Sequence, residues 1–143
     1  GDSQQKILNT LCREIEKLFD KNILATVFLT ETNKNYIYLA SAPQLNLFEP
    51  ISFTHKFVNQ NNKIEEAIYS ERINKSSIWR KNLDSIQKNT YTHCHSYPLL
   101  DQNKTLLGYF NLSFKNDNQM GEFELNVLKL AGYLASISIE RKK

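Results

Sequence analysis

The sequence predicts an α+β domain with mainly antiparallel strands, on the basis of three observations. Apolar residues recur every three or four positions near both ends of the chain, which is the period of one helical face. Two internal segments have the pattern of a strand, a polar turn and a second strand, and the part between these hairpins is irregular. This order predicts N- and C-terminal helices side by side on one face of the sheet, with short helices and loops over a pocket on the other.

Length and composition favour one domain, residues 1–143. A chain of 143 residues that is 41% hydrophobic can bury a full core. Its 18 basic residues are scattered, so we expect no nucleic-acid partner. No apolar run approaches the roughly 20 residues that span a bilayer, and no signal sequence opens the chain, so we expect a cytoplasmic protein without a membrane partner. Because the chain begins at Gly1 without an initiator methionine, we expect it to be part of a larger protein.

Hydrophobic periodicity and turn residues define the expected elements. They are, in order, a helix from Ser3 to about residues 20–22, strands at 24–30 and 36–40, a helical turn between Pro43 and Pro50, a helix at 63–69, a strand at 72–78, a helix at 79–87, strands at 91–100 and 106–115, and a helix at 121–142. In the last strand, apolar side chains alternate with Asn111 and Ser113, so one face of it is core. Gly108 in this strand predicts a close backbone approach or a bulge.

Apolar residues on the last helix form two stripes. The first contains Phe123, Val127, Leu130, Ala131 and Leu134, and the second contains Leu125, Leu128, Gly132, Ala135 and Ile139. Together they exceed the single stripe that one sheet contact requires. The second stripe therefore predicts a homodimer through the terminal helices, and Ala135→Glu should then give a folded monomer.

A series of segments resembles the motifs of one family. They are Ala25–Leu29, Leu39–Leu45, Ile78–Trp79, the block His93–Leu100 with Leu107–Leu112, and Glu124–Arg141. The block is the most specific, because Cys94, Ser96, Pro98 and Gly108 stand in the places where the family has its Cys, Ser, Pro and Gly. In order and spacing, these segments resemble the GAF domain, a small-molecule sensor module of signalling proteins.

The resemblance implies a fold and a role. The fold is an antiparallel sheet of about six strands with helices on both faces. The role is that of a regulatory input domain of a bacterial signalling protein, ahead of a cyclic-di-GMP enzyme or histidine kinase, with the last helix passing a signal to an effector domain C-terminal to Lys143. Residues 60–67 differ from the family's pocket-lining segment, so no pocket residue is carried over there, and the ligand and any cofactor are unknown.

Five side chains are candidates for ligand contact: Phe53, Trp79, His93, His95 and Tyr97. His93 and His95 share one face of a strand, and with Tyr97 they could make polar contacts if that face is the pocket face. The alternative is packing against aromatic residues. A metal site would need a third ligand, and His55 is the only other histidine, so we expect no metal. Trp79 and Phe53 could line a pocket or simply cover the sheet.

The leading interpretation is a sensor and dimerisation domain that binds an unidentified small molecule. An alternative is a ligand-free interaction module whose pocket is filled by Trp79 and Phe53. A third, a free methionine sulfoxide reductase, needs a nucleophilic cysteine and a resolving one, but in the expected fold Cys12 lies on the N-terminal helix, across the sheet from the pocket. Because no catalytic motif is present, we expect no enzyme activity.

Overall fold

The computed structural model describes residues 2–19, 23–30, 37–45, 51–52, 68–74, 91–115 and 120–140. The elements in this part are α1 (Asp2–Leu18), β1 (Leu24–Thr30), β2 (Ile37–Ser41), the 3-10 helix η1 (Pro43–Leu45), β3 (Ile51–Ser52), β4 (Tyr69–Arg72), β5 (His93–Leu100), β6 (Leu106–Phe114) and α3 (Glu122–Glu140). None of the described helices is long and apolar enough to cross a membrane.

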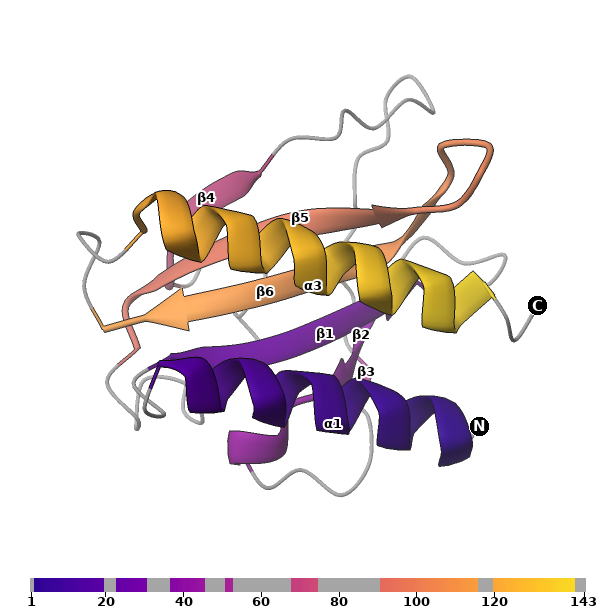
Figure 1. The fold of residues 1–143 in the computed structure, drawn as a ribbon, viewed down its shortest axis with the longest axis horizontal. Coiled ribbons are helices and arrows are strands. Elements are labelled where there is room, and N and C mark those ends of the chain that lie inside the picture. The colour runs from indigo at the N-terminus through magenta and orange to yellow at the C-terminus, as the bar shows by residue number, and fades with distance from the viewer. Residues whose placement is uncertain are drawn as a thin grey trace.

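Six strands form one sheet in the order β3-β2-β1-β6-β5-β4, and each neighbouring pair is antiparallel. Helices α1 and α3 lie side by side over one face of this sheet and run in opposite directions (Figure 1). An edge-to-face contact between Phe19 and Phe123, with ring centroids 5.7 Å apart, joins the end of α1 to the start of α3. The α+β fold class and the position of the terminal helices are therefore confirmed.

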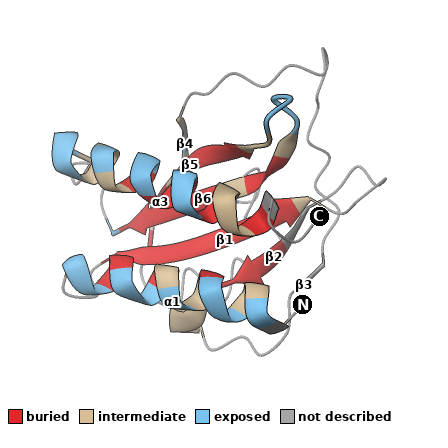
Figure 2. Cartoon of the chain, turned by 45° about the vertical axis from the view of Figure 1, so that its right-hand side comes forward, coloured by how far each residue is buried: buried red, intermediate tan, exposed pale blue. Residues whose placement is uncertain are grey.

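The larger core lies between the sheet and the two helices. Because successive strand side chains point to opposite faces, alternate residues of β1 and β6 meet the helices. These are Ala25, Val27, Leu29, Phe110, Leu112 and Phe114, all at most 5% exposed. Leu8 and Cys12 of α1 and Leu128 of α3 pack against them, and both helices turn exposed residues away from the sheet (Figure 2). We call this side of the sheet the helix-covered face and the other side the second face.

A smaller core lies on the second face. It contains the intervening residues Leu24 and Phe28 of β1, together with Leu39, Tyr91 and Cys94. All of these side chains are at most 2% exposed. The described strands therefore carry buried side chains on both faces of the sheet.

The β5–β6 hairpin has the turn and the close approach that the sequence predicts. Asp101 closes the turn, because its Oδ1 accepts hydrogen bonds from the backbone N–H groups of Asn103 (2.8 Å) and Thr105 (2.9 Å). The register of β5 against β6 shifts beside Gly108. A Cβ at Gly108 would overlap the carbonyl oxygen of Phe28, so only glycine lets β6 pass this close to β1.

The middle of the chain differs from the prediction. β4 begins at Tyr69, which the sequence places in a helix, and it ends at Arg72, where the sequence begins a strand. Pairing with β5 explains the difference, because Ser70 and Arg72 are register partners of His95 and His93. Such tertiary pairing overrides local helical pattern. β3 has two residues, too few to give a sequence pattern, and the helix expected at 79–87 lies outside the described residues.

The second apolar stripe of α3 faces the sheet. Leu128 and Ala135 are fully buried there, whereas Phe123, Leu130 and Leu134 of the first stripe are 58%, 58% and 42% exposed. The expectation that Ala135→Glu gives a folded monomer is therefore wrong, because this substitution would put a charge into the core. Of the first stripe, Phe123, Leu130 and Leu134 are open to a partner, whereas Ala131 is buried in the core.

Candidate functional site

Three of the predicted ligand-contacting residues lie on the helix-covered face. Tyr97 belongs to the core beneath α3, where Gly132 leaves space for its ring. The ring of His95 packs edge-on against Phe114, with ring centroids 5.4 Å apart. His93 lies two residues earlier on the same strand and so points to the same side. The other two candidates, Trp79 and Phe53, lie outside the described residues.

The surroundings of His95 favour a neutral, structural imidazole. Its Nδ1 lies 2.7 Å from Ser70 Oγ, and its buried Nε2 has no hydrogen-bond partner in the described part of the chain. Burial, and secondly the neighbouring His93, lower the pKa of His95. Among the described residues, no three His, Cys, Asp or Glu side chains are grouped so that they could hold a metal ion.

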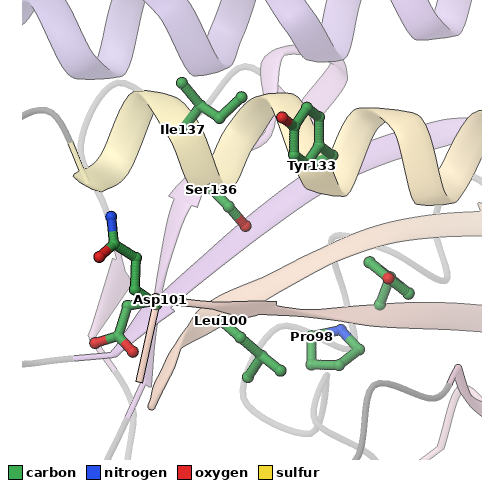
Figure 3. A pocket seen from close by; sticks show the side chains of 8 residues that line it. Pro98, Leu100, Asp101, Tyr133, Ser136 and Ile137 are labelled. Carbon is green, nitrogen blue, oxygen red and sulfur yellow. The ribbon is translucent and has the colours of Figure 1, made fainter. Parts of the chain in front are cut away.

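A cavity of about 290 Å³ opens between α3 and the end of the β5–β6 hairpin (Figure 3). Its lining includes Tyr97, Leu100, Asp101, Tyr133, Ser136 and Ile137. One oxygen of Asp101 already accepts two backbone hydrogen bonds in the turn, and Tyr133 is 63% exposed. The cavity is thus an open hollow at the helix surface, and of the predicted site residues that the structure describes, Tyr97 alone lines it.

The second face carries a row of buried polar side chains across three neighbouring strands. Thr26 of β1, Asn111 of β6 and Ser96 of β5 are direct register partners, and Ser113 and Cys94 form the next rung. All five are at most 1% exposed. Thr, Ser and Asn are mostly exposed in proteins, and when buried they are normally hydrogen bonded. This row, which we call the polar row, therefore needs a chemical explanation.

Only one of the two polar atoms of the Asn111 side chain has a hydrogen-bond partner among the described residues. Its Nδ2 donates to Oγ1 of Thr26 (3.2 Å) and to the carbonyl oxygen of Thr26 (3.4 Å). Its Oδ1, and Oγ of Ser113, are buried without a hydrogen-bond partner among the described residues. A buried polar group left unpaired costs roughly 1–3 kcal/mol of stability. Two such groups on one face mark a place where a bound molecule can complete the hydrogen bonding.

Sequence reasoning missed the polar row. The alternation in β6 places Asn111 and Ser113 on the side opposite the core positions, but it does not show whether that side is exposed to solvent or buried. The available signal is composition. Thr26, Ser96, Asn111 and Ser113 are all uncharged, whereas a solvated strand face usually includes charged residues.

A buried hydrogen-bond network joins α1 to the second face. Glu16 is 5% exposed, and its Oε2 accepts from the backbone N–H of Ala25 (3.0 Å) and from Nε2 of Gln44 (3.2 Å). Oε1 of Gln44 in turn accepts from the hydroxyl of Tyr91. Burial, and secondly Glu16, raise the pKa of Tyr91, so its hydroxyl remains a donor. Because Tyr91 packs in the second-face core, the network links both sides of the sheet.

The two cysteines lie in different cores on opposite faces of the sheet. Burial raises the pKa of the Cys12 thiol to about 12, so it stays protonated. The thiolate is the reactive form, and a resolving cysteine must reach its partner. The arrangement therefore gives no support to a sulfoxide reductase that uses Cys12 and Cys94.

Comparison with known proteins identifies the fold. No family model matches the chain, and no curated protein matches it. A domain of a putative two-component sensor histidine kinase protein from Sinorhizobium meliloti has a TM-score of 0.66 at 13% identity, over 95% of this chain and 90% of that one. The blue-light absorbing PixJ GAF domain of Thermosynechococcus elongatus has a TM-score of 0.69 at 14% sequence identity, over 98% of this chain and 86% of that one. The GAF domain of an Acinetobacter phosphoenolpyruvate-protein phosphotransferase has a TM-score of 0.64 at 12% sequence identity, over 96% of this chain and 82% of that one.

These matches extend over nearly the whole chain, and at such low identity they describe the fold alone. An antiparallel sheet of six strands with both terminal helices on one face defines an α+β domain. The chain has the fold of a GAF domain, and the resemblance in its sequence motifs is confirmed at the level of the fold.

Proposed function

We propose that the chain is the cytoplasmic sensor and dimerisation domain of a bacterial signal-transduction protein and that it binds a small molecule on the second face without catalysis. The observation that carries this proposal is the polar row, with Oδ1 of Asn111 and Oγ of Ser113 buried and unpartnered among the described residues. The shared fold supports it, since one similar structure is a domain of a putative sensor histidine kinase and another is a light-absorbing GAF domain.

Five residues from the sequence prediction take different places in this proposal. Trp79 and Phe53 remain candidates for the lining of the ligand site. His93, His95 and Tyr97 face the helices, so they act through packing rather than through polar contact with a ligand on the second face. Tyr97 follows Ser96 directly and lies against α3, so a ligand-induced shift of β5 would move α3 and any effector domain beyond Lys143. Transmission requires that the ligand favour one arrangement over another.

The exposed helix surface supports the dimer. Phe123, Leu130, Tyr133 and Leu134 of α3 and Ile7 and Leu18 of α1 are large apolar side chains, each between 42% and 63% exposed. Apolar patches of this kind mark interaction sites. The exposed positions 123, 130 and 134 repeat at heptad-like intervals along one side of α3, which suits packing against the same helix of a second copy.

Native mass spectrometry of the purified domain tests the proposal. We expect a dimer that carries an extra mass, which disappears on denaturation. Asn111→Leu should remove that mass, and Asn126→Leu, at an exposed position of α3, should keep it. A ligand-free dimer would instead favour the interaction module with a self-filled pocket, and a ligand-free monomer would contradict both parts of the proposal.

A further inference from the structure

The cavity between α3 and the end of the β5–β6 hairpin, which we call the hairpin hollow, has two walls that the fold holds in place. One wall is the helix, where Tyr133, Ser136 and Ile137 share one side because they are three and four residues apart. The other wall includes the hairpin turn, which hydrogen bonds to the backbone and side chain of Asp101 close. Binding between preformed walls avoids the entropy cost of ordering them, which suits the hollow to a small ligand.

The lining of the hairpin hollow is mainly aromatic and aliphatic. Tyr97 of β5, which is 9% exposed, and Tyr133 of α3, which is 63% exposed, each contribute a ring. Pro98, Leu100 and Ile137 contribute aliphatic surface. A bound aromatic ring can contact both tyrosines by offset stacking or edge to face. The volume of about 290 Å³ is at the small end for ligand cavities, so it suits a molecule of one or two rings.

Ser136 supplies a hydrogen-bonding group at the helix wall. Its side chain extends from α3 on the side of the hollow (Figure 3). Its hydroxyl makes no hydrogen bond within the part of the chain that the structure describes, whereas the hydroxyl of Ser138 donates to the carbonyl oxygen of Leu134 (3.2 Å). A serine hydroxyl can both donate and accept, so Ser136 can pair with either kind of polar group on a ligand.

We infer that the hairpin hollow is a ligand site for a small aromatic molecule with one hydrogen-bonding group, of the phenol or indole type. The ring lies against Tyr97 and Tyr133, and the polar group pairs with Ser136. This site is separate from the one proposed on the second face and does not depend on it. Because Tyr97 also lies against Gly132 of α3, an occupant contacts strand and helix together and holds α3 to β5.

Two neutral alcohols of similar size test the aromatic requirement: phenol carries its hydroxyl on an aromatic ring and cyclohexanol carries it on a saturated one. We expect millimolar phenol to shift the backbone NMR signals of Leu100, Asp101, Ser136 and Ile137. Cyclohexanol should bind about fivefold more weakly, since it lacks the ring contacts with the tyrosines. Tyr133→Leu changes an exposed side chain, so the variant should fold, and it should reduce this preference for phenol.

Toluene, which has a methyl group in place of the hydroxyl of phenol, tests the role of Ser136. Ser136→Ala should weaken phenol binding about fivefold and leave toluene binding unchanged, because only phenol loses a hydrogen bond. Ser138→Ala is the matched control on the same helix. Its hydroxyl is already bonded within α3, so this variant should bind phenol like the wild type.

The inference is overturned if cyclohexanol binds as tightly as phenol, if Ser136→Ala leaves phenol binding unchanged, or if the shifted signals map outside the hairpin hollow. Absence of binding by every probe at millimolar concentration overturns it as well. Signals of the hollow that shift when the protein alone is diluted would assign this surface to a second copy of the chain, and the ligand site would again be wrong. None of these outcomes bears on the ligand proposed for the second face.

Discussion

The ring of Tyr97 occupies the space that a side chain at Gly132 would need. A Cβ at Gly132 would lie 2.5 Å from Cδ2 of this ring, which is far inside van der Waals contact. Glycine in a helix interior is less favourable than alanine by about 1 kcal/mol, so Gly132 lowers the intrinsic stability of the α3 helix. The absence of a side chain at Gly132 lets α3 approach β5 closely at Tyr97.

Gly132→Ala should destabilise the domain although alanine is the better helix former. Overpacking in a core usually costs about 1–3 kcal/mol, which exceeds the helical gain. Urea unfolding followed by circular dichroism measures the change in the free energy of unfolding. In a Tyr97→Leu background the ring is absent, so the same Gly132→Ala exchange should become neutral or stabilising. Destabilisation of equal size in both backgrounds would show that the ring is not the cause.

Leu130→Glu should convert the proposed dimer into a folded monomer. Leu130 is 58% exposed on α3, so a charge there disturbs a partner and not the core. Lys129→Glu, an exposed neighbour that also gains negative charge, is the matched control and should remain dimeric. Light scattering after size-exclusion chromatography reports the mass. If Leu130→Glu and wild type have the same mass, the exposed α3 stripe does not form the dimer contact.

Glu16→Ala should lower the free energy of unfolding by about 1–3 kcal/mol. The substitution leaves the buried N–H of Ala25 without its acceptor, which costs roughly that amount, whereas Nε2 of Gln44 keeps its hydrogen bond to the carbonyl oxygen of Ile23. Glu14→Ala on the same helix breaks only the surface pair with Lys17, whose side chains are 60% and 64% exposed, and should cost less than about 0.5 kcal/mol. Equal effects in urea unfolding would exclude the buried network as a source of stability.

Stability should fall as the pH drops through the ordinary histidine range. The pKa of His95 is lowered in the folded state by burial and then by His93, so the unfolded chain takes up the proton first. The contribution of His95 is therefore complete above the unfolded pKa of about 6.5 and is lost progressively below it. Unfolding curves at pH 7.5 and pH 5.5 should show a smaller loss for His95→Gln than for wild type. The same loss in both proteins would mean that other groups carry the acid sensitivity.

Hydrophobic pattern was sufficient to predict the fold class, the two hairpins and the terminal helices, because each of these elements has at least one buried face. The alternation in β6 and the helical period of α3 follow directly from that requirement. It was not sufficient for the site. Periodicity shows that Asn111 and Phe110 face opposite ways, but burial of Asn111 depends on what covers the second face. For the same reason the side taken by His95 and the side taken by Ala135 could be read only from the folded chain.

Ser96 and Tyr97 are consecutive residues of β5 that point to opposite faces of the sheet. The proposed ligand side and the helix side are thus separated by the thickness of one peptide unit. Coupling between two sites is reciprocal, so a ligand that alters the contact of Tyr97 with α3 is itself bound more or less tightly when that contact is altered. If the domain binds its ligand on the second face as proposed, residues on the helix side that never touch the ligand would therefore adjust the affinity for it.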